Sequence, residues 1–189
     1  DPDLMLSVPP HLTAYQGFDA LFHSTEGDLN KTANPISDLF ALKAISLIGQ
    51  SLAAAVADGS NADARADVAL ANTLSGMVET VSGCTSEHSL EHALSACHPA
   101  LPHGAGLIAI SLAYYTHFAG TGACDQRLVD MARALGRADA ASPMDFVDAL
   151  AALQKACGVD NIALSAYGAD VARAAEYARI ARDTMGGLY

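Results

Sequence analysis

The chain has 189 residues and a mass of 19.4 kDa, a length typical of one domain, and its 51% hydrophobic content with only 16% charged residues excludes disorder. A formal net charge of −11, from 21 acidic against 10 basic residues, argues against nucleic acid or an anionic membrane surface as a partner. We expect no membrane span, because the apolar stretch Gly104–Phe118 is shorter than the roughly 20 residues that cross a bilayer.

Proline, asparagine and glycine divide the first half of the chain into three predicted helices. Two prolines precede a helix over 12–29. Asn34 caps a second helix that runs to Gly59, and we expect that helix to be largely buried. Asn61 caps a third helix, which ends at Gly83. The apolar residues of the second helix are Ile36, Leu39, Phe40, Leu47, Ile48, Leu52 and Val56. The inward residues expected in the third are Val68, Leu70, Leu74, Met77, Val78 and Val81.

The second half predicts further helices and no strand. Thr85 or Ser86 opens a short helix through Ala96, and prolines force its end. Further helices are expected over 103–118, 125–135, 143–157 and 169–185, the last one stopped by Gly186 and Gly187. The inward face expected for that last helix carries Val171, Ala174, Ala175, Ala178, Ala181 and Met185. No stretch alternates as a half-buried strand would, so the prediction is one all-α domain over residues 1–189, a bundle of about seven helices.

Four of the seven histidines fall within sixteen residues, from His88 to His103. His88 and His92 are four apart and therefore share one helix face, and His103 begins the next helix after a proline-constrained turn. Asp19 and His23 form a second pair with the same spacing. Nitrogen and oxygen donors that converge from rigid helices suit iron(II), zinc or nickel, so the spacing indicates a divalent metal site without ranking these metals.

Each histidine also has a purely structural interpretation. We expect His11, His98 and His117 to be structural, and the paired histidines could be incidental in a non-catalytic helical scaffold. Cys84 and Cys97 bracket the His88 pair and offer a competing zinc site, although no CxxC spacing supports it. Scattered cysteines and the lack of a secretory signal predict a reduced, cytoplasmic compartment.

Three stretches of this sequence resemble one known family. They are PPHLTAYQGFDALFHSTEG (9–27), NPISDLFALKAI (34–45) and HSLEHALSACHPALPHGAGLIAIS (88–111). Together they are similar to the C-terminal helical domain of the iron-containing, group III alcohol dehydrogenases, in the dehydroquinate synthase-like superfamily. The resemblance extends over nearly the whole chain.

The resemblance implies a set of site residues. The metal, Fe²⁺ in the family with Zn²⁺ or Ni²⁺ possible, is expected on Asp19, His23, His88 and His103. His92 is expected beside the metal, in contact with substrate or nicotinamide, where it relays a proton as the catalytic and cofactor-binding residue. Glu26 and Glu91 have two interpretations: they either orient imidazoles or are solvated surface carboxylates.

The resemblance also implies hydride transfer between a primary or secondary alcohol, or its aldehyde, and NAD or NADP. The nucleotide is expected mainly on an N-terminal α/β domain whose glycine-rich loop is not found in these residues. We therefore expect this chain to bind metal weakly but to be inactive alone, and the full-length enzyme to be a homo-oligomer, most simply a dimer. Glycerol dehydrogenase and maleylacetate reductase are related alternatives. A helical metal-dependent phosphohydrolase is disfavoured, because no histidine here is followed by aspartate.

Overall fold

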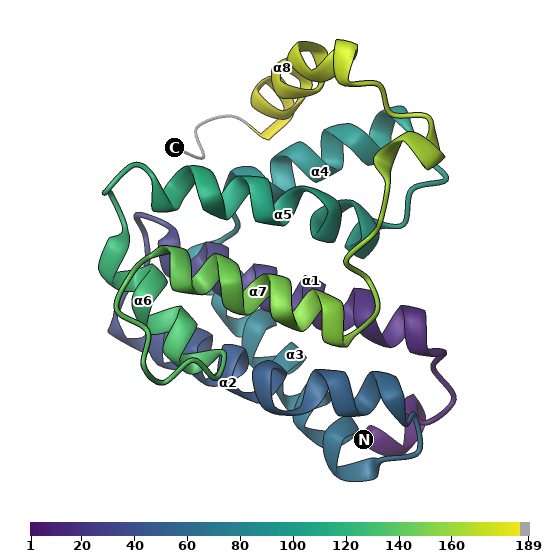
Figure 1. Cartoon of the computed structure of the whole chain (residues 1–189), viewed down its shortest axis with the longest axis vertical. Coiled ribbons are helices and arrows are strands. Elements are labelled where there is room, and N and C mark those ends of the chain that lie inside the picture. Colours follow the sequence, from purple (N-terminus) through teal and green to yellow (C-terminus); the bar gives the residue numbers. More distant parts are fainter. Residues whose placement is uncertain (186–189) are drawn as a thin grey trace.

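The computed structural model describes residues 1–185, and that part of the chain is helical without any strand (Figure 1). This confirms the predicted all-α class, with eight α-helices where about seven were expected. The helices are α1 (Pro10–Leu29), α2 (Pro35–Ala57), α3 (Ala62–Ser82), α4 (Ser86–Cys97), α5 (His103–Ala119), α6 (Asp125–Ala134), α7 (Met144–Ala156) and α8 (Ala174–Met185). Short 3₁₀ helices lie at Pro2–Met5, Leu164–Tyr167 and Val171–Arg173. The expected stop at Gly186 and Gly187 lies outside the described residues.

Local capping residues set the predicted helix ends. The Asn34 side chain accepts hydrogen bonds from the amides of Ile36 and Ser37, and Ser37 completes a capping box. The Asn61 side chain accepts from the Ala64 amide at the start of α3. Gly83 ends α3 with a φ of 73°, a left-handed backbone conformation that favours glycine.

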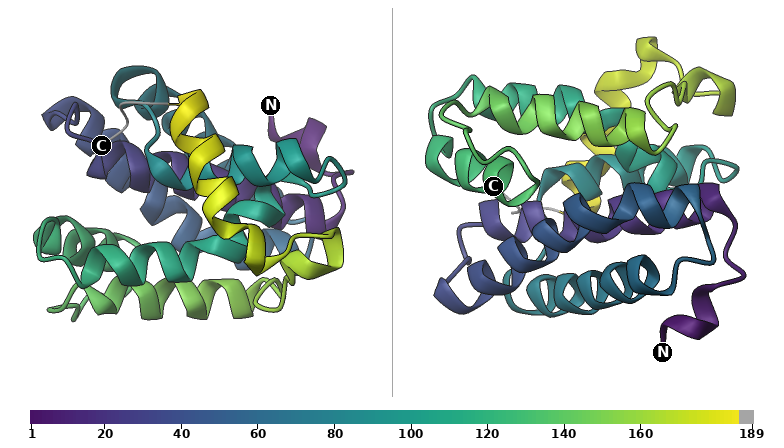
Figure 2. Two further views of the ribbon diagram at one scale, coloured as in Figure 1. Left: turned by 90° about the horizontal axis from the view of Figure 1, so that it is seen from above. Right: turned by 60° about the horizontal axis from the view of Figure 1, so that its bottom comes forward.

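Helix α1 lies at the centre of the bundle and contacts α2, α3 and α5 (Figures 1 and 2). On one side it packs with α2 and α3, and on the other α5 and α7 form a second group with α6. Helix α8 packs mainly on α4, over a small separate apolar cluster. This cluster comprises Ala93, Leu94, Leu101, Ala105, Tyr177 and Ala181. Helices α1, α4 and α5 therefore meet between the main core and the smaller one.

We based the expectation of no membrane span on the stretch Gly104–Phe118, but α2 is a longer apolar helix. Its 23 residues have a mean hydropathy of 1.7 in the most apolar window, which is long and apolar enough to cross a membrane. In the fold α2 packs against α1 and α3, and Ile45, Ile48 and Leu52 are fully buried, as in the core helix of a globular domain. Its first turns differ from the prediction, because Ile36 and Leu39 are 63% and 70% exposed.

The predicted inward faces of α3 and α8 were partly wrong. In α3 the contact with α1 and α2 runs along a stripe of mostly small residues, which allows close packing and leaves three larger side chains exposed. The buried stripe is Ala64, Val68, Ala71, Ser75 and Val78, and the exposed side chains are Leu70, Met77 and Val81. In α8 the buried residues are Tyr177 and Ala181, whereas Ala174, Ala175 and Ala178 are exposed. Val171 is also exposed and lies outside α8, which starts only at residue 174.

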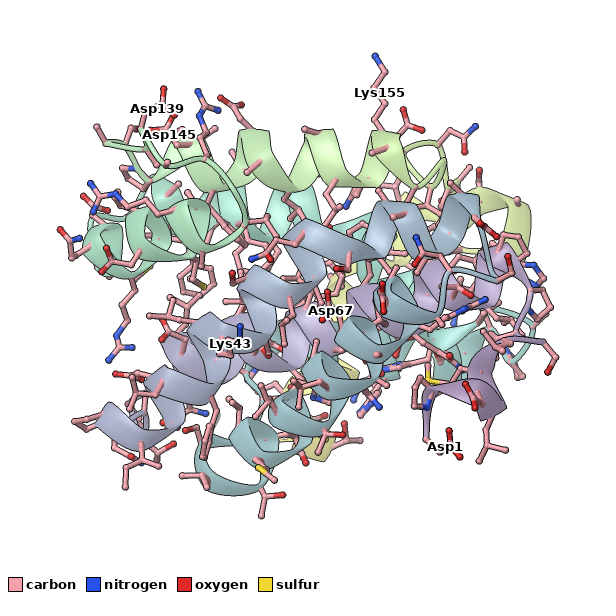
Figure 3. All side chains as sticks on the ribbon, turned by 90° about the horizontal axis from the view of Figure 1, so that it is seen from below. Asp1, Lys43, Asp67, Asp139, Asp145 and Lys155 are labelled. Atoms are coloured by element: carbon pink, nitrogen blue, oxygen red, sulfur yellow. The ribbon has the colours of Figure 1, made fainter. Side chains whose placement is uncertain are left out.

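Most charged side chains lie on the surface of the bundle, and among the described residues Arg65 is the largest side chain that is fully buried. Lys43 and Lys155 are exposed on its surface (Figure 3). Arg65 of α3 is fully buried and donates hydrogen bonds to the carbonyl oxygens of Val8 and Gly59 and to the Thr13 hydroxyl. Its guanidinium thereby ties the N-terminal segment to α1 and α3.

Candidate metal centre

Three of the four predicted ligands converge on a carboxylate oxygen of the fourth, Asp19. Asp19 and His23 extend from α1, one helical turn apart, while His88 comes from α4 and His103 is the first residue of α5. The Nε2 atoms of His23 and His88 each lie 3.4 Å from Asp19 Oδ1, and the Nε2 atom of His103 lies 3.2 Å from it. Three helices thus supply three imidazoles and one carboxylate to a single point.

The spacing of these atoms suits a metal ion better than hydrogen bonds. Nitrogen–oxygen distances of 3.2–3.4 Å lie at or beyond the upper end of ordinary hydrogen bonds. Donors held about 2.1 Å from a tetrahedral ion are roughly 3.4 Å apart, which matches these distances. The ligand atoms of Asp19, His88 and His103 lie within 4.8 Å of one another, and His23 forms a second such group with Cys84 and His88. The donor set therefore fits a divalent ion.

Two glycines let α5 approach closely enough to present His103. A Cβ on Gly104 would lie 2.6 Å from the backbone oxygen of Tyr15 in α1. A Cβ on Gly106 would lie 2.7 Å from a carboxylate oxygen of Glu91 in α4. Because both separations are shorter than real Cβ contacts, the start of α5 can sit against α1 and α4 only without these side chains.

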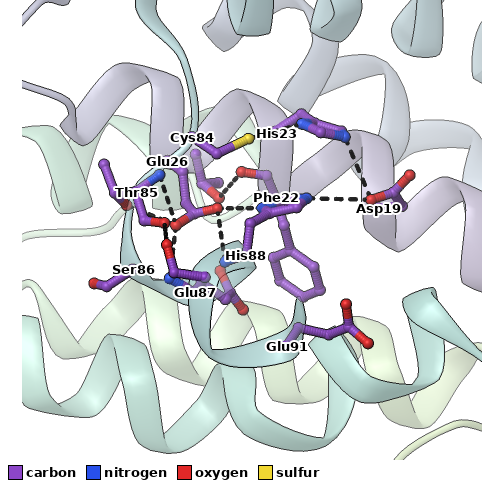
Figure 4. Close-up of polar contacts among 12 residues, drawn as sticks. Asp19, Phe22, His23, Glu26, Cys84, Thr85, Ser86, Glu87, His88 and Glu91 are labelled. Atoms are coloured by element: carbon purple, nitrogen blue, oxygen red, sulfur yellow. Dashed lines mark hydrogen bonds and ion pairs between the residues drawn. The ribbon is translucent and has the colours of Figure 1, made fainter. Parts of the chain in front are cut away.

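Each of the three imidazoles that approach Asp19 has a second partner at Nδ1 (Figure 4 shows those of His23 and His88). His88 Nδ1 donates to Glu26, and His103 Nδ1 donates to Glu91. His23 Nδ1 lies 3.0 Å from the Cys84 sulfur. Both glutamates are fully buried, so the alternative that they are solvated surface carboxylates was wrong.

Glu26 also serves as the N-terminal cap of α4. Its Oε1 accepts from the amides of Thr85 and Glu87 at 3.0 and 2.8 Å, and its Oε2 accepts from the His88 amide at 3.3 Å. The Thr85 side chain itself donates to Glu26 rather than capping the helix. A carboxylate at a helix N-terminus faces the positive end of the helix dipole, so α1 fixes where α4 begins.

A second buried carboxyl lies behind the cluster. Glu87 is fully buried and accepts from the Tyr115 hydroxyl at 2.7 Å, while its other oxygen has no hydrogen-bond partner among the described residues. Burial, and next the negative charge of Glu26, raises the pKa of Glu87 well above its ordinary value. The hydrogen bond of the Glu87 side chain is with Tyr115 of α5.

Asp19 and the histidines shift one another's ionisation. Burial opposes ionisation of Asp19, but hydrogen bonds from His103 and His88 outweigh it and hold its pKa well below the ordinary value. Burial likewise opposes protonation of His103, yet hydrogen bonds to Asp19 and Glu91 raise its pKa to about 9. The pKa of His88 is raised in the same way, against burial, by Asp19 and by Glu26. Without a cation, protons therefore occupy this carboxylate-rich cluster.

His92 stands beside the cluster without joining it. Its ring centroid lies 6.2 Å from that of His88 and 5.4 Å from that of His103, and its side chain is exposed. Burial, and next the neighbouring His103, lowers the pKa of His92 below its ordinary value. A pocket of about 600 Å³ opens over the cluster, and its lining includes His92, Lys31 and Met185.

The remaining predicted sites lie elsewhere. Cys97 packs in the apolar cluster under α8 and belongs to none of the metal-capable groups within residues 1–185, so the Cys84–Cys97 zinc site is not formed. His98 bonds to the Tyr177 hydroxyl at 2.9 Å, and His11 makes an edge contact with Tyr15. His117 lies at the exposed end of α5 beside Phe118, and none of these three histidines belongs to a metal-capable group in the described part of the chain.

Sequence reasoning missed Cys84 as a neighbour of His23 and left the two glutamates undecided. A signal for Glu26 was present, because Asp19, His23 and Glu26 follow the i, i+4, i+7 spacing of one helix face. Glu91 follows His88 by three residues and has the same property. Nothing local marks Cys84, which approaches His23 from 61 residues away.

Comparison with known proteins identifies what this chain is similar to. A model of the C-terminal part of the Fe-containing alcohol dehydrogenase family matches residues 13–187. Alcohol dehydrogenase 4 of Saccharomyces cerevisiae is 43% identical over 104 residues, which cover 55% of this chain and 27% of the yeast protein. Long-chain-alcohol dehydrogenase 1 of Geobacillus thermodenitrificans is 38% identical over 136 residues, 72% of this chain and 34% of that protein. The archaeal halo-thermophilic Red Sea brine pool alcohol dehydrogenase ADH/D1, solved bound to NZQ, superposes with a TM-score of 0.91 at 32% identity. That superposition covers 100% of this chain and 48% of ADH/D1, so the chain spans about half the length of this solved relative.

Proposed function

This chain belongs to the Fe-containing alcohol dehydrogenase family, and from that membership we propose that it forms the metal-binding half of a dehydrogenase active site. The reaction is hydride transfer between a primary or secondary alcohol, or its aldehyde, and NAD or NADP. The observation that carries the proposal is the convergence of three Nε2 atoms on Asp19 Oδ1 at 3.2–3.4 Å. The names of the relatives describe alcohol dehydrogenases and support the same substrate class.

The proposed metal ligands are Asp19, His23, His88 and His103. Iron(II) is the ion that the family name favours, and zinc or nickel suits the same nitrogen and oxygen donors. When bound, such a cation supplies Lewis-acid polarisation of the substrate oxygen. The carboxylate and the buried partners of the imidazoles are the groups of this chain that balance the positive charge.

His92 is the residue that we propose for proton exchange. It is exposed, lies in the pocket beside His103, and has a pKa below the ordinary histidine value, so it is neutral at pH 7 and able to accept the proton of a substrate hydroxyl. Its position next to the cluster, rather than within it, leaves it free to contact substrate or nicotinamide.

The rest of the enzyme is proposed by analogy with the relatives. We propose that an α/β domain outside these 189 residues binds most of the nucleotide, that the complete protein is a dimer in the cytoplasm, and that this chain alone binds metal without turning over substrate. NAD-dependent alcohol oxidation by the isolated chain would contradict the last of these proposals.

Metal analysis of three variants tests the site. We expect His88→Ala and His103→Ala each to abolish stoichiometric metal in protein purified without chelators, as measured by elemental analysis. His117→Ala, which changes an exposed histidine remote from Asp19, is the matched control and should keep the wild-type metal content. Unchanged metal content in all three variants would instead support the alternative of a helical scaffold with incidental histidines.

A further inference from the structure

Glu91 is a buried carboxylate that forms a hydrogen bond with one of the proposed metal ligands. It lies in the middle of α4 and is fully buried. One carboxylate oxygen accepts from His103 Nδ1 and the other accepts from the Ser95 hydroxyl. Because burying an ionised carboxylate is costly unless strong hydrogen bonds compensate, the bond to His103 is the main interaction that holds this charge in place.

We propose that Glu91 is a positioning residue, which fixes the tautomer and ring orientation of His103 and thereby sets the metal affinity of the centre. The inference rests on the proposed metal site and adds a residue outside its ligand set. An ionised carboxylate can only accept a hydrogen bond, so it requires the proton of a neutral His103 to reside on Nδ1. The lone pair of Nε2, 3.2 Å from Asp19 Oδ1, then points to the place where the ligands meet.

Gly106 of α5 leaves the space that the Glu91 side chain occupies. A Cβ on Gly106 would lie 2.7 Å from Glu91 Oε1 and 2.8 Å from its Cγ, so only glycine leaves room for this side chain. Gly106 is three residues beyond His103 on the same helix. Helix α5 therefore presents both the imidazole and the space for the carboxylate that orients it.

Glu91 allows a cleaner test than Glu26. Glu26 holds His88 in the same way, but it also accepts from three amides at the start of α4, so its replacement disturbs the helix itself. The hydrogen bonds of Glu91 are with side chains alone. Glu91→Gln keeps the shape of the residue and removes the feature that fixes the tautomer, because an amide can either donate or accept.

The test is a calorimetric titration of the metal-free 189-residue chain with Zn²⁺. We expect Glu91→Gln to weaken binding by about 10- to 100-fold, the usual effect of losing a group that orients a metal-binding histidine. Glu87→Gln is the matched control: it is the same substitution, at a buried carboxyl of the same helix, but its bond is with Tyr115, and it should change the affinity less than twofold.

A double-variant cycle separates orientation from simple loss of charge. In a His103→Ala background the three remaining ligands should bind Zn²⁺ only weakly, so the titration is extended to Zn²⁺ concentrations that fill this weakened site. If Glu91 acts through His103, then Glu91→Gln should have no further effect on that residual affinity. An equal effect in both backgrounds would overturn the proposal, since it would show a long-range charge contribution. Gly106→Ala, which displaces Glu91 from the α5 side, should reproduce the loss seen in Glu91→Gln.

Nitrogen-15 chemical shifts of the His103 ring provide a readout that needs no metal. The wild-type chain at a pH above the His103 pKa should carry its proton on Nδ1, and Glu91→Gln should give a mixture of tautomers. Unchanged shifts in that variant, or Zn²⁺ affinity within twofold of wild type, would refute the role of Glu91. Failure of the wild-type chain to bind Zn²⁺ would refute the proposed metal site instead, and the ring shifts would still decide the role of Glu91.

Discussion

Asp28→Asn should stabilise this protein at neutral pH, although the wild-type residue forms an ion pair. Asp28 lies in the last turn of α1 and is 2% exposed, and Arg127 of α6 approaches it at 3.0 Å. Arg127 is shared with Asp38, and the negative end of the α1 dipole faces the Asp28 carboxylate. Burial therefore outweighs the attraction of Arg127 and raises the pKa of Asp28 from 3.8 to about 6.

The magnitude follows from linkage between ionisation and folding. A tenfold change in an ionisation constant corresponds to about 1.4 kcal/mol, so a pKa raised from 3.8 to about 6 means that ionised Asp28 destabilises the fold by about 3 kcal/mol. Because the folded pKa is the higher one, this contribution is small below about pH 4, grows as the pH rises, and is complete above about pH 6.5. Asparagine keeps an oxygen that accepts from Arg127 and carries no charge to bury.

Denaturant titrations at about pH 4 and pH 7.5 measure the effect. We expect the stability advantage of Asp28→Asn over wild type to be about 2–3 kcal/mol larger at the higher pH. Asp38→Asn is the matched control: it removes the more exposed partner of the same arginine, and at pH 7.5 it should lower stability by less than about 1 kcal/mol. If Asp28→Asn proved more destabilising at pH 7.5 than at pH 4, the ion pair would outweigh the burial of the charge, and the reasoning would be refuted.

Three further predictions concern the buried arginine and the metal centre. Arg65→Met should lower the free energy of unfolding by about 2–4 kcal/mol, because the buried Thr13 hydroxyl and two partly buried carbonyl oxygens lose their donor. A loss under about 1 kcal/mol in denaturant titration would contradict this. Gly104→Ala should weaken Zn²⁺ binding at least tenfold in calorimetry, since its Cβ would lie 2.6 Å from the backbone oxygen of Tyr15. Gly76→Ala is the control: a Cβ there has nothing within 4 Å, so the variant should keep the Zn²⁺ affinity and gain roughly 0.5–1 kcal/mol of stability. Zn²⁺ affinity should fall as the pH drops below 9, because the ion must displace the proton of His103, whose pKa is about 9, and a constant affinity from about pH 6 to 9 would argue against ligation by His103.

The helix boundaries were predictable because they depend on local chemistry. Asn34 and Asn61 cap their helices and Gly83 ends α3 in the left-handed region, and each of these effects involves only a few neighbouring residues. Which face is buried depends on distant partners. Alanine gives little preference for either face, so the pattern over 169–185 suggested burial of residues such as Val171, which lies before α8 and is 89% exposed.

In the candidate site, too, features set by neighbouring residues were predictable and those set by distant contacts were not. The i, i+4 spacing of Asp19 and His23 placed both side chains on one face of α1, and the histidine density before His103 pointed to the other helices. The partners at Nδ1 were not predictable in this way. Glu26 caps a helix that begins some sixty residues later, and that contact exists only once α1 and α4 have packed.

The pocket over the metal cluster has a floor of residues from α1, α4 and α5, and Met185 at the end of α8 lines one side of it. We expect α8 to be less stable than the helices of the floor. Helices α1 and α5 contribute buried residues to the main core. Helix α8 is held chiefly on α4 through Tyr177 and Ala181. An element anchored on one neighbour can detach in a local opening that leaves the rest of the domain folded. Amide hydrogen exchange in α8 should therefore be faster than in α1, and its rate would measure how often the pocket is open to solvent.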